Sequence, residues 1–214
     1  MKINKDTLLF GSFSKNPGNV GCKIFNTCFE YHDINAIYKS FSVENIKDAL
    51  ISAKCLNFSG FAISMPFKTE VIQYLDIKDS IVQKTNSCNT VIIKENKLIG
   101  YNTDYFAIYD YLKSNTNVKD KIIILGNGSY SKNVQLCCKE LLINFEIIIR
   151  EDWCKIKDIK NSVIFNCTPV ENIEIDSSNY YIDCINTSKT GLELSKKQAA
   201  LQYKLYVNKE LPLK

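Results

Sequence analysis

The sequence predicts an α/β protein built in two parts. Short β-branched and aromatic runs alternate with segments of helical periodicity along the 214 residues. In the second part, the apolar residues 122–125 lead directly into Gly126-Asn127-Gly128, which is typical of a strand that delivers a glycine turn to a helix. A chain of this length can bury a substantial core, either in one domain or in two small lobes.

Breaker residues and periodicity divide the first part into elements. Strands are expected at residues 7–10, 34–41, 61–63, 89–93 and 97–101, the last two forming a hairpin. Helices are expected near residues 22–29 and from a cap at Ser42 to about Cys55. Gly11 is expected to end the first strand. Pro66 fits the first turn of a further helix, which puts Lys68 near its start, at the carboxyl end of a strand.

The second part shows a succession of strands and helices that implies a parallel sheet. Strands are expected at residues 122–125, 146–149, 163–165 and 180–183. Helices are expected at residues 130–142 and 153–159 and, after Gly191, at 192–206. The polar residues 114–117 are the expected boundary between the two parts.

Composition excludes several classes of function. The net charge is only +4 and the lysines are spread along the chain, so a solvated surface is expected and nucleic-acid binding is not. No apolar run approaches the ~20 residues of a membrane span and no signal peptide is evident, so a cytoplasmic protein without membrane contact is expected. Nine cysteines without a Cys-x-x-Cys pair and a single histidine argue against a metal site. Nothing in the sequence indicates an oligomeric state.

A lysine and an aspartate are the best candidates for proton transfer. Oxidation of a secondary alcohol sends a hydride to a cofactor and needs a protein group that accepts the proton. The single histidine, His32, lies in a predicted polar turn. This leaves Lys68 as the group that exchanges the proton and Asp104 as the group that holds the lysine in place. A structural ion pair is the alternative. Uncharged polar side chains suited to a polyhydroxylated ligand accompany the pair: Ser14, Asn16, Ser64, Asn89 and Gln198.

The glycine turn suggests a dinucleotide site. Gly126 and Gly128 allow the backbone to approach a pyrophosphate at a helix N-terminus, and the third small position falls on Ser131. A tight turn without a ligand is the alternative. At the end of the next strand Arg150 can clamp a 2′-phosphate, whereas Glu151 can accept a hydrogen bond from a free 2′-hydroxyl. These residues by themselves leave NADP and NAD both open.

Taken together, these segments resemble the shikimate dehydrogenase family over nearly the whole chain. Ser14-Lys15-Asn16-Pro17 is similar to the family's Ser-x-Ser-Pro loop, and Ser64-Met65-Pro66-Phe67-Lys68 to its Thr-x-Pro-His/Phe-Lys segment. The other similar segments are Asn89-Thr90, Tyr101-Asn102-Thr103-Asp104, the turn from Gly126 to Lys132, Arg150, Asn166-Cys167-Thr168-Pro169 and Gln198-Ala199-Ala200.

The resemblance implies a two-lobe α/β fold. Residues 1–104 with 190–214 would form the substrate-binding catalytic domain, in which the C-terminal helix returns to the first lobe. Residues 105–189 would form a Rossmann-like dinucleotide-binding domain, reduced because the chain between Asp183 and Gly191 is shorter than the family pattern. The implied cofactor-binding residues are Gly126, Asn127, Gly128, Ser129, Tyr130, Ser131, Arg150 and Thr168.

The implied reaction is the reversible, NADP-dependent reduction of 3-dehydroshikimate to shikimate in aromatic amino acid biosynthesis. Lys68 and Asp104 would be catalytic, and the five polar residues above would bind the substrate. The loop from Gly11 to Gly18 is most similar to the shikimate dehydrogenase-like branch, for which shikimate need not be the best substrate. Two alternatives stay open: a dehydrogenase of quinate or another hydroxy acid that uses NAD, and a non-catalytic protein that binds a small molecule.

Overall fold

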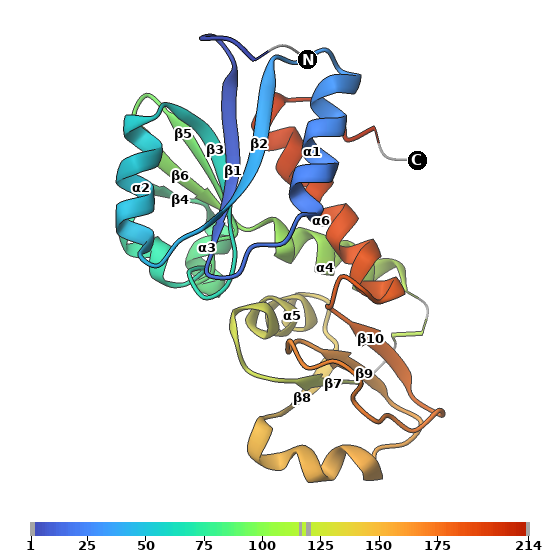
Figure 1. Ribbon diagram of the computed structural model, residues 1–214. Helices are drawn as coiled ribbons and strands as arrows, with labels where there is room; N and C mark the ends of the chain where they lie inside the picture. Colours follow the sequence, from blue (N-terminus) through green and yellow to red (C-terminus); the bar gives the residue numbers. More distant parts are fainter. Residues whose placement is uncertain (1–2, 116, 119–120, 213–214) are drawn as a thin grey trace. The chain divides into compact units, whose positions relative to one another are not determined.

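A computed structural model describes residues 3–115, 117–118 and 121–212 and divides the chain into two compact units (Figure 1). The first unit comprises Met1–Thr103 with Ala199–Lys214, and the second comprises Asp104–Gln198. The polar residues 114–117, predicted as the boundary, lie within the span of the second unit, and Thr116 is outside the described residues.

The first unit contains a mixed six-stranded sheet. Its strands are β1 (Leu8–Ser14), β2 (Ala36–Ser42), β3 (Phe58–Ile63), β4 (Ile77–Lys78), β5 (Thr90–Lys94) and β6 (Lys97–Tyr101). They lie in the order β2-β1-β3-β5-β6-β4, with β1 parallel to β2 and β3 and with β5 antiparallel to β3 and β6. This topology brings the carboxyl ends of β1 and β3 to the same edge as the amino end of β5.

Helices cover both faces of this sheet. They are α1 (Val20–Tyr31), α2 (Ile46–Cys55), the 3₁₀ helix η1 (Glu70–Tyr74), α3 (Ser80–Thr85) and the C-terminal half of α6 (Lys189–Val207). Figure 1 shows α1 and α6 together on one face and α2 on the other. Phe10 and Phe13 of β1 point to opposite faces, so Phe10 packs with Phe29 and Tyr203 while Phe13 packs with Phe61.

Two local expectations for the first unit are wrong, and two short elements were missed. Gly11 continues β1, because a Cβ there would lie 2.6 Å from the Lys39 carbonyl oxygen and only glycine allows so close an approach between the strands. The N-cap of α2 is Asn45 and not Ser42, since the Asn45 side chain accepts a hydrogen bond from the backbone N–H of Asp48 at 3.2 Å. The short β4 and α3 were not predicted.

The helix expected at Pro66 does not form. Residues 64–67 make a turn closed by the hydrogen bond from Phe67 N–H to the Ser64 carbonyl (2.9 Å), and the Met65–Pro66 peptide bond is cis. The 3₁₀ helix η1 begins only at Glu70. Lys68 therefore lies in the turn and not in a helix.

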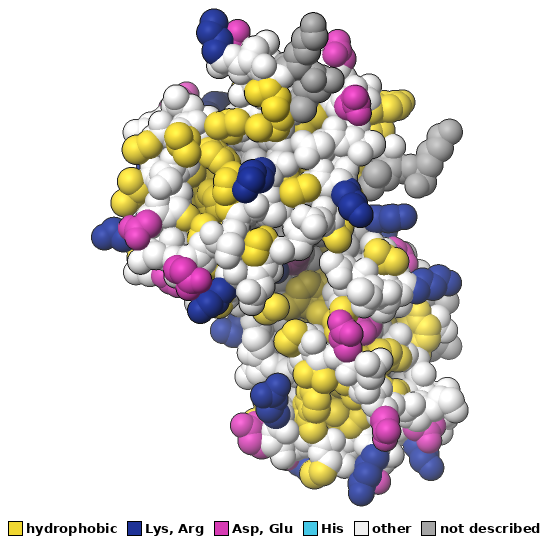
Figure 2. Space-filling view, viewed as in Figure 1, with side chains coloured by type: hydrophobic (Ala, Val, Ile, Leu, Met, Phe, Trp, Pro, Cys, Tyr) yellow, Lys and Arg dark blue, Asp and Glu magenta, His cyan; other side chains and the backbone are white. Residues whose placement is uncertain are grey.

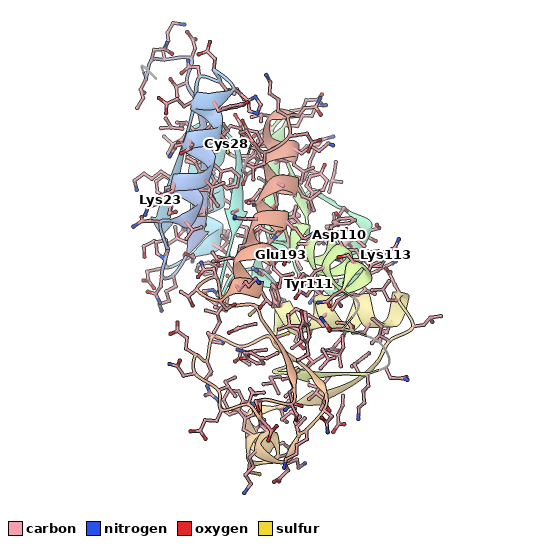
Figure 3. The ribbon with its side chains drawn as sticks, turned by 90° about the vertical axis from the view of Figure 1, so that its right-hand side faces the viewer. Lys23, Cys28, Asp110, Tyr111, Lys113 and Glu193 are labelled. Carbon is pink, nitrogen blue, oxygen red and sulfur yellow. The ribbon has the colours of Figure 1, made fainter. Side chains whose placement is uncertain are left out.

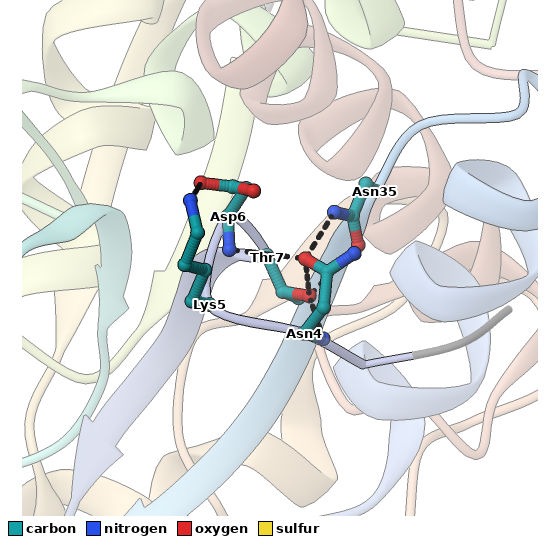
Figure 4. A network of polar contacts seen from close by, with 5 residues as sticks. All are labelled: Asn4, Lys5, Asp6, Thr7 and Asn35. Atoms are coloured by element: carbon teal, nitrogen blue, oxygen red, sulfur yellow. Dashed lines mark hydrogen bonds and ion pairs between the residues drawn. The ribbon is translucent and has the colours of Figure 1, made fainter.

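A polar network fastens the segment before β1 to the loop before β2 (Figure 4). The Thr7 hydroxyl donates to Asn35 Oδ1 at 2.8 Å, and Asn35 Nδ2 donates to Asn4 Oδ1 at 3.0 Å. The backbone N–H of Leu8 also donates to the Asn35 carbonyl at 2.9 Å. These contacts support the parallel register in which Leu8 faces Ala36.

The second unit contains the predicted parallel sheet. Its strands are β7 (Lys121–Leu125), β8 (Asn144–Ile148), β9 (Val163–Asn166) and β10 (Tyr180–Asp183), in the order β10-β9-β7-β8. The segment expected to be a helix after β8 is a 3₁₀ helix, η2 (Arg150–Asp158), whose Ile156 packs with Ile123 and Leu125 of β7.

The remaining helices of this unit are α4 (Thr103–Ser114), α5 (Ser129–Glu140) and the first half of α6. Figure 3 labels Asp110 and Tyr111 on α4 and Glu193 on α6. Asp110 forms an ion pair with Lys197, which ties α4 to α6, and the Tyr111 hydroxyl lies 3.3 Å from that of Tyr180 on β10. The sequence places the start of α6 at Leu192, but the helix begins at Lys189 and includes Gly191, where a Cβ would overlap the Ile185 carbonyl.

Candidate functional site

Two of the predicted substrate segments lie side by side at the carboxyl edge of the first unit's sheet. The backbone N–H of Ser64 donates to the Phe13 carbonyl at 3.0 Å, and that of Lys15 donates to the Met65 carbonyl at 3.2 Å. These two bonds tie the loop after β1 to the turn after β3. Ser14 is buried at the end of β1, whereas the side chains of Asn16 and Ser64 are exposed.

Lys68 and Asn89 come from neighbouring segments of the same edge. The backbone N–H of Cys88 donates to the Lys68 carbonyl at 2.8 Å, and the backbone N–H of Ile63 donates to the Asn89 carbonyl at 2.8 Å. Burial raises the pKa of the Cys88 thiol to about 12, while the positive charge of Lys68 acts in the opposite direction. Lys68 is half-buried and within electrostatic reach of Cys88, the residue next to Asn89.

Three residues of this edge were missed by the sequence analysis: Thr90, Thr103 and Gln202. The Asn89 side chain bonds to Thr103, the Thr90 hydroxyl donates to Asn89 Oδ1 at 3.0 Å, and Gln202 Nε2 donates to the Thr90 hydroxyl at 2.9 Å. Thr90 and Thr103 are sequence neighbours of predicted site residues. Gln202 lies 112 positions from Thr90, and no spacing in the sequence connects them.

In the second unit, Gly126 makes the turn that follows β7. Its φ is +93°, a conformation that L side chains rarely adopt, and its N–H donates to the Ile148 carbonyl at 2.9 Å. A Cβ on Gly126 would also lie 2.7 Å from Cγ2 of Thr168. Glycine is required here for two independent reasons.

Gly128 opens the N-terminus of α5. It is extended, no side-chain hydrogen bond caps the helix there, and a Cβ added to it would meet nothing within 4 Å. Gln135 Nε2 donates to Asn127 Oδ1 at 3.1 Å and to the hydroxyl of the buried Ser131 at 3.0 Å, which holds the turn against the helix. A helix N-terminus with open space before it is suited to an anion such as a pyrophosphate.

The carboxyl ends of β8 and β9 lie on either side of this turn. Arg150 is exposed at the first position of η2, two residues after β8, and β8 and β9 both pair with β7. Thr168 is held after β9 by Asn166, whose Oδ1 accepts from the Thr168 N–H at 3.0 Å and from its hydroxyl at 2.7 Å. The structure thus brings Gly126, Arg150 and Thr168 to one edge of the parallel sheet, as the resemblance implies.

Asp104 lies in the first turn of α4, directly after Thr103, and its side chain is buried. Burial raises the pKa of the Tyr130 phenol well above its usual value, and the charge of Asp104 raises it further. The predicted aspartate is therefore near the first turn of α5, the helix that follows the glycine turn. Lys68 belongs to the first unit, and Asp104 and the half-buried Gln198 to the second, so the pairing of Lys68 with Asp104 stays a prediction.

Within residues 3–115, 117–118 and 121–212, no three His, Cys, Asp or Glu side chains are grouped so that they could hold a metal ion. Over the same ranges, no helix is long and apolar enough to cross a membrane. His32 stacks on Tyr203, and its Nε2 lies 3.0 Å from the Glu210 carbonyl oxygen. On the face shown in Figure 2, lysine and arginine side chains are scattered.

The chain is similar to known proteins over both units. A family model of the shikimate dehydrogenase substrate binding domain matches residues 20–91. The shikimate dehydrogenase-like protein of Haemophilus influenzae is 37% identical over 133 residues, which are 62% of this chain and 49% of that protein. The NADP-dependent shikimate dehydrogenase of Clostridium beijerinckii is 30% identical over 193 residues, which are 80% of this chain and 72% of that protein. The match thus spans about half to three quarters of these relatives.

Solved structures show the same fold. The shikimate dehydrogenase of Aquifex aeolicus superposes with a TM-score of 0.83 at 24% identity, covering 99% of this chain and 96% of that one. A shikimate 5-dehydrogenase-like protein superposes with a TM-score of 0.82 at 24% identity, covering 98% and 94%. The predicted α/β fold class is confirmed. Because the Clostridium relative is matched over most of its length, this chain belongs to the shikimate dehydrogenase family.

Proposed function

We propose that this protein is an NADP-dependent dehydrogenase that interconverts 3-dehydroshikimate and shikimate. The observation that carries the proposal is the edge of the first unit's sheet, where backbone hydrogen bonds tie together the segments of Ser14, Ser64, Lys68 and Asn89. A lysine amine among hydroxyls and an amide suits a small ligand with hydroxyl groups and a carboxylate. The relatives named NADP-dependent shikimate dehydrogenases support this substrate class.

The residues of the second unit fit a dinucleotide. When bound, NADP would accept the hydride from the substrate carbon. The turn Gly126-Asn127-Gly128 and the first turn of α5 would hold the pyrophosphate, and the guanidinium of Arg150 would pair with the 2′-phosphate. Glu151 beside Arg150 makes NAD the alternative cofactor.

Lys68 would take the proton that leaves the substrate hydroxyl as the hydride leaves the carbon, and would return it in the reverse direction. Asp104 would orient the substrate hydroxyl and the lysine. Ser14, Asn16, Ser64, Asn89 and Gln198 would bind the ring hydroxyls and the carboxylate.

The test is the absorbance of reduced nicotinamide with shikimate and NADP, repeated with NAD and with quinate. We expect Lys68→Ala to lower kcat roughly 10²- to 10⁴-fold while KM changes little. Lys94→Ala is the matched control, because Lys94 is an exposed lysine at the far end of the strand β5 that begins next to Asn89. Equal turnover in Lys68→Ala and the parent would refute the role of Lys68.

Calorimetric titration separates the remaining alternatives. A protein that binds shikimate but neither dinucleotide would be a non-catalytic binding protein. For a dehydrogenase that selects NADP through Arg150, Arg150→Ala should weaken NADP binding and leave NAD binding unchanged.

A further inference from the structure

The amide of Asn89 is held by Thr103 and Thr90. Its Oδ1 accepts hydrogen bonds from the backbone N–H of Thr103 at 2.8 Å and from the Thr90 hydroxyl at 3.0 Å. Its Nδ2 donates to the Thr103 hydroxyl at 2.9 Å. Asn89 is 4% exposed, Thr90 0% and Thr103 2%, so water does not compete for these bonds.

These contacts settle which way the amide points. A backbone N–H can only donate, so the Asn89 atom that faces Thr103 N must be the oxygen and not the nitrogen. That N–H at 2.8 Å and the Thr90 hydroxyl at 3.0 Å are the nearest donors to Oδ1, and the Thr103 hydroxyl lies 3.2 Å from it, so the acceptor capacity of Oδ1 is filled. Nδ2 carries two hydrogens, and Thr103 is its one partner among the described residues. The group of Asn89 that is left to bond to a ligand is therefore a donor, the second N–H of Nδ2.

Gln202 controls the Thr90 hydroxyl. That hydroxyl has a single proton, and its oxygen lies 2.9 Å from Gln202 Nε2, which can only donate. Because Gln202 offers a donor, the hydroxyl proton must go to another acceptor, and Asn89 Oδ1 at 3.0 Å is nearer than the Thr103 hydroxyl oxygen at 3.4 Å. Gln202 is 2% exposed and lies on the part of α6 that belongs to the first unit, so this bond connects the C-terminal helix to Asn89.

We propose that Thr90 and Gln202 are positioning residues through which α6 makes Asn89 present an N–H donor to the substrate. The matching substrate group is an acceptor, either the oxygen of a ring hydroxyl or that of a carboxylate. The identity of the ligand rests on the proposed function, whereas the orientation of the amide does not.

The kinetic test uses near-isosteric substitutions. Thr90→Val removes the hydroxyl and Gln202→Met removes the amide, and each is expected to raise KM for shikimate about 5- to 10-fold with kcat within about twofold. Thr90→Ser keeps the hydroxyl and should restore the parent KM. The KM of the double variant should be no higher than that of the single variant with the larger KM, because both substitutions break the same chain of hydrogen bonds.

A spectroscopic readout is independent of turnover. The side-chain amide cross-peak of Asn89, identified by its loss in Asn89→Asp, should shift in Thr90→Val and in Gln202→Met and return in Thr90→Ser. If the parent protein oxidises no shikimate but the cross-peak shifts, the proposed function is wrong and the positioning of Asn89 stands. An unmoved cross-peak, or a lowered Tm with an unchanged KM, would overturn the positioning role.

Discussion

Replacing Gly126 with alanine should destabilise the second unit strongly. The added Cβ would lie 2.7 Å from Thr168 Cγ2, several tenths of an ångström inside ordinary contact, and the φ of +93° disfavours any L side chain. The strained backbone costs about 1–2 kcal/mol and the overpacking about 1–3 kcal/mol. We expect the free energy of unfolding to fall by roughly 2–5 kcal/mol, measured by urea unfolding followed by circular dichroism.

Two further variants separate the contribution of the strained backbone from that of the overpacking. Thr168→Ser removes Cγ2 but keeps the hydroxyl that bonds to Asn166. Combined with Gly126→Ala, it should restore only the part of the free energy of unfolding that is lost through the contact between the new Cβ and Cγ2. Gly128→Ala is the matched control, because its Cβ meets nothing within 4 Å and its φ of −81° is ordinary. It should change stability little and weaken NADP binding if a pyrophosphate lies there. Unfolding of Gly126→Ala at the same urea concentration as the parent would refute the reasoning.

Three further predictions concern pH and hydrogen bonding. Burial raises the pKa of Asp79, so the folded protein binds the proton of this carboxyl group more tightly than the unfolded chain does, and the free energy of unfolding should fall as pH rises above 3.8. Asparagine at this position still caps the N-terminus of α3, so Asp79→Asn should abolish the fall, measured by urea unfolding at pH 4 and pH 7. The hydrogen bond from the Leu98 N–H lowers the pKa of Asp76, so the stability contributed by that carboxylate is present above pH 3.8 and lost as pH falls below it. In Asp76→Asn, the free energy of unfolding should therefore decrease less as pH falls below 3.8 than it does in the parent. Tyr180→Phe removes the hydroxyl that accepts from Asn115 Nδ2 at 3.0 Å, and should cost about 1 kcal/mol in free energy of unfolding.

Periodicity predicted most strands and helices because it depends only on local side-chain chemistry. The hairpin of β5 and β6 is confirmed, with β5 shifted by one residue, and the strand β10 is confirmed at the expected residues. The errors fall where a neighbour in space overrides the local preference. Gly11 stays in β1 because the backbone of β2 approaches it, and Gly191 stays within α6 because the Ile185 carbonyl takes the place of a side chain. Neither contact can be read from the residues alone.

The family and the α/β class follow from the sequence alone, and so do the residues of the candidate site, because motifs such as Ser64-Met65-Pro66-Phe67-Lys68 and Gly126-Asn127-Gly128 carry their chemistry in consecutive positions. The orientation of those groups depends on contacts made in the folded chain. The orientation of the Asn89 amide is set by the backbone N–H of Thr103 and the Thr90 hydroxyl, which both donate to its oxygen, and Gln202 of the C-terminal helix donates in turn to that hydroxyl. Hydrogen-bond direction depends on which atoms meet in space, and residues 112 positions apart meet only after the chain has folded.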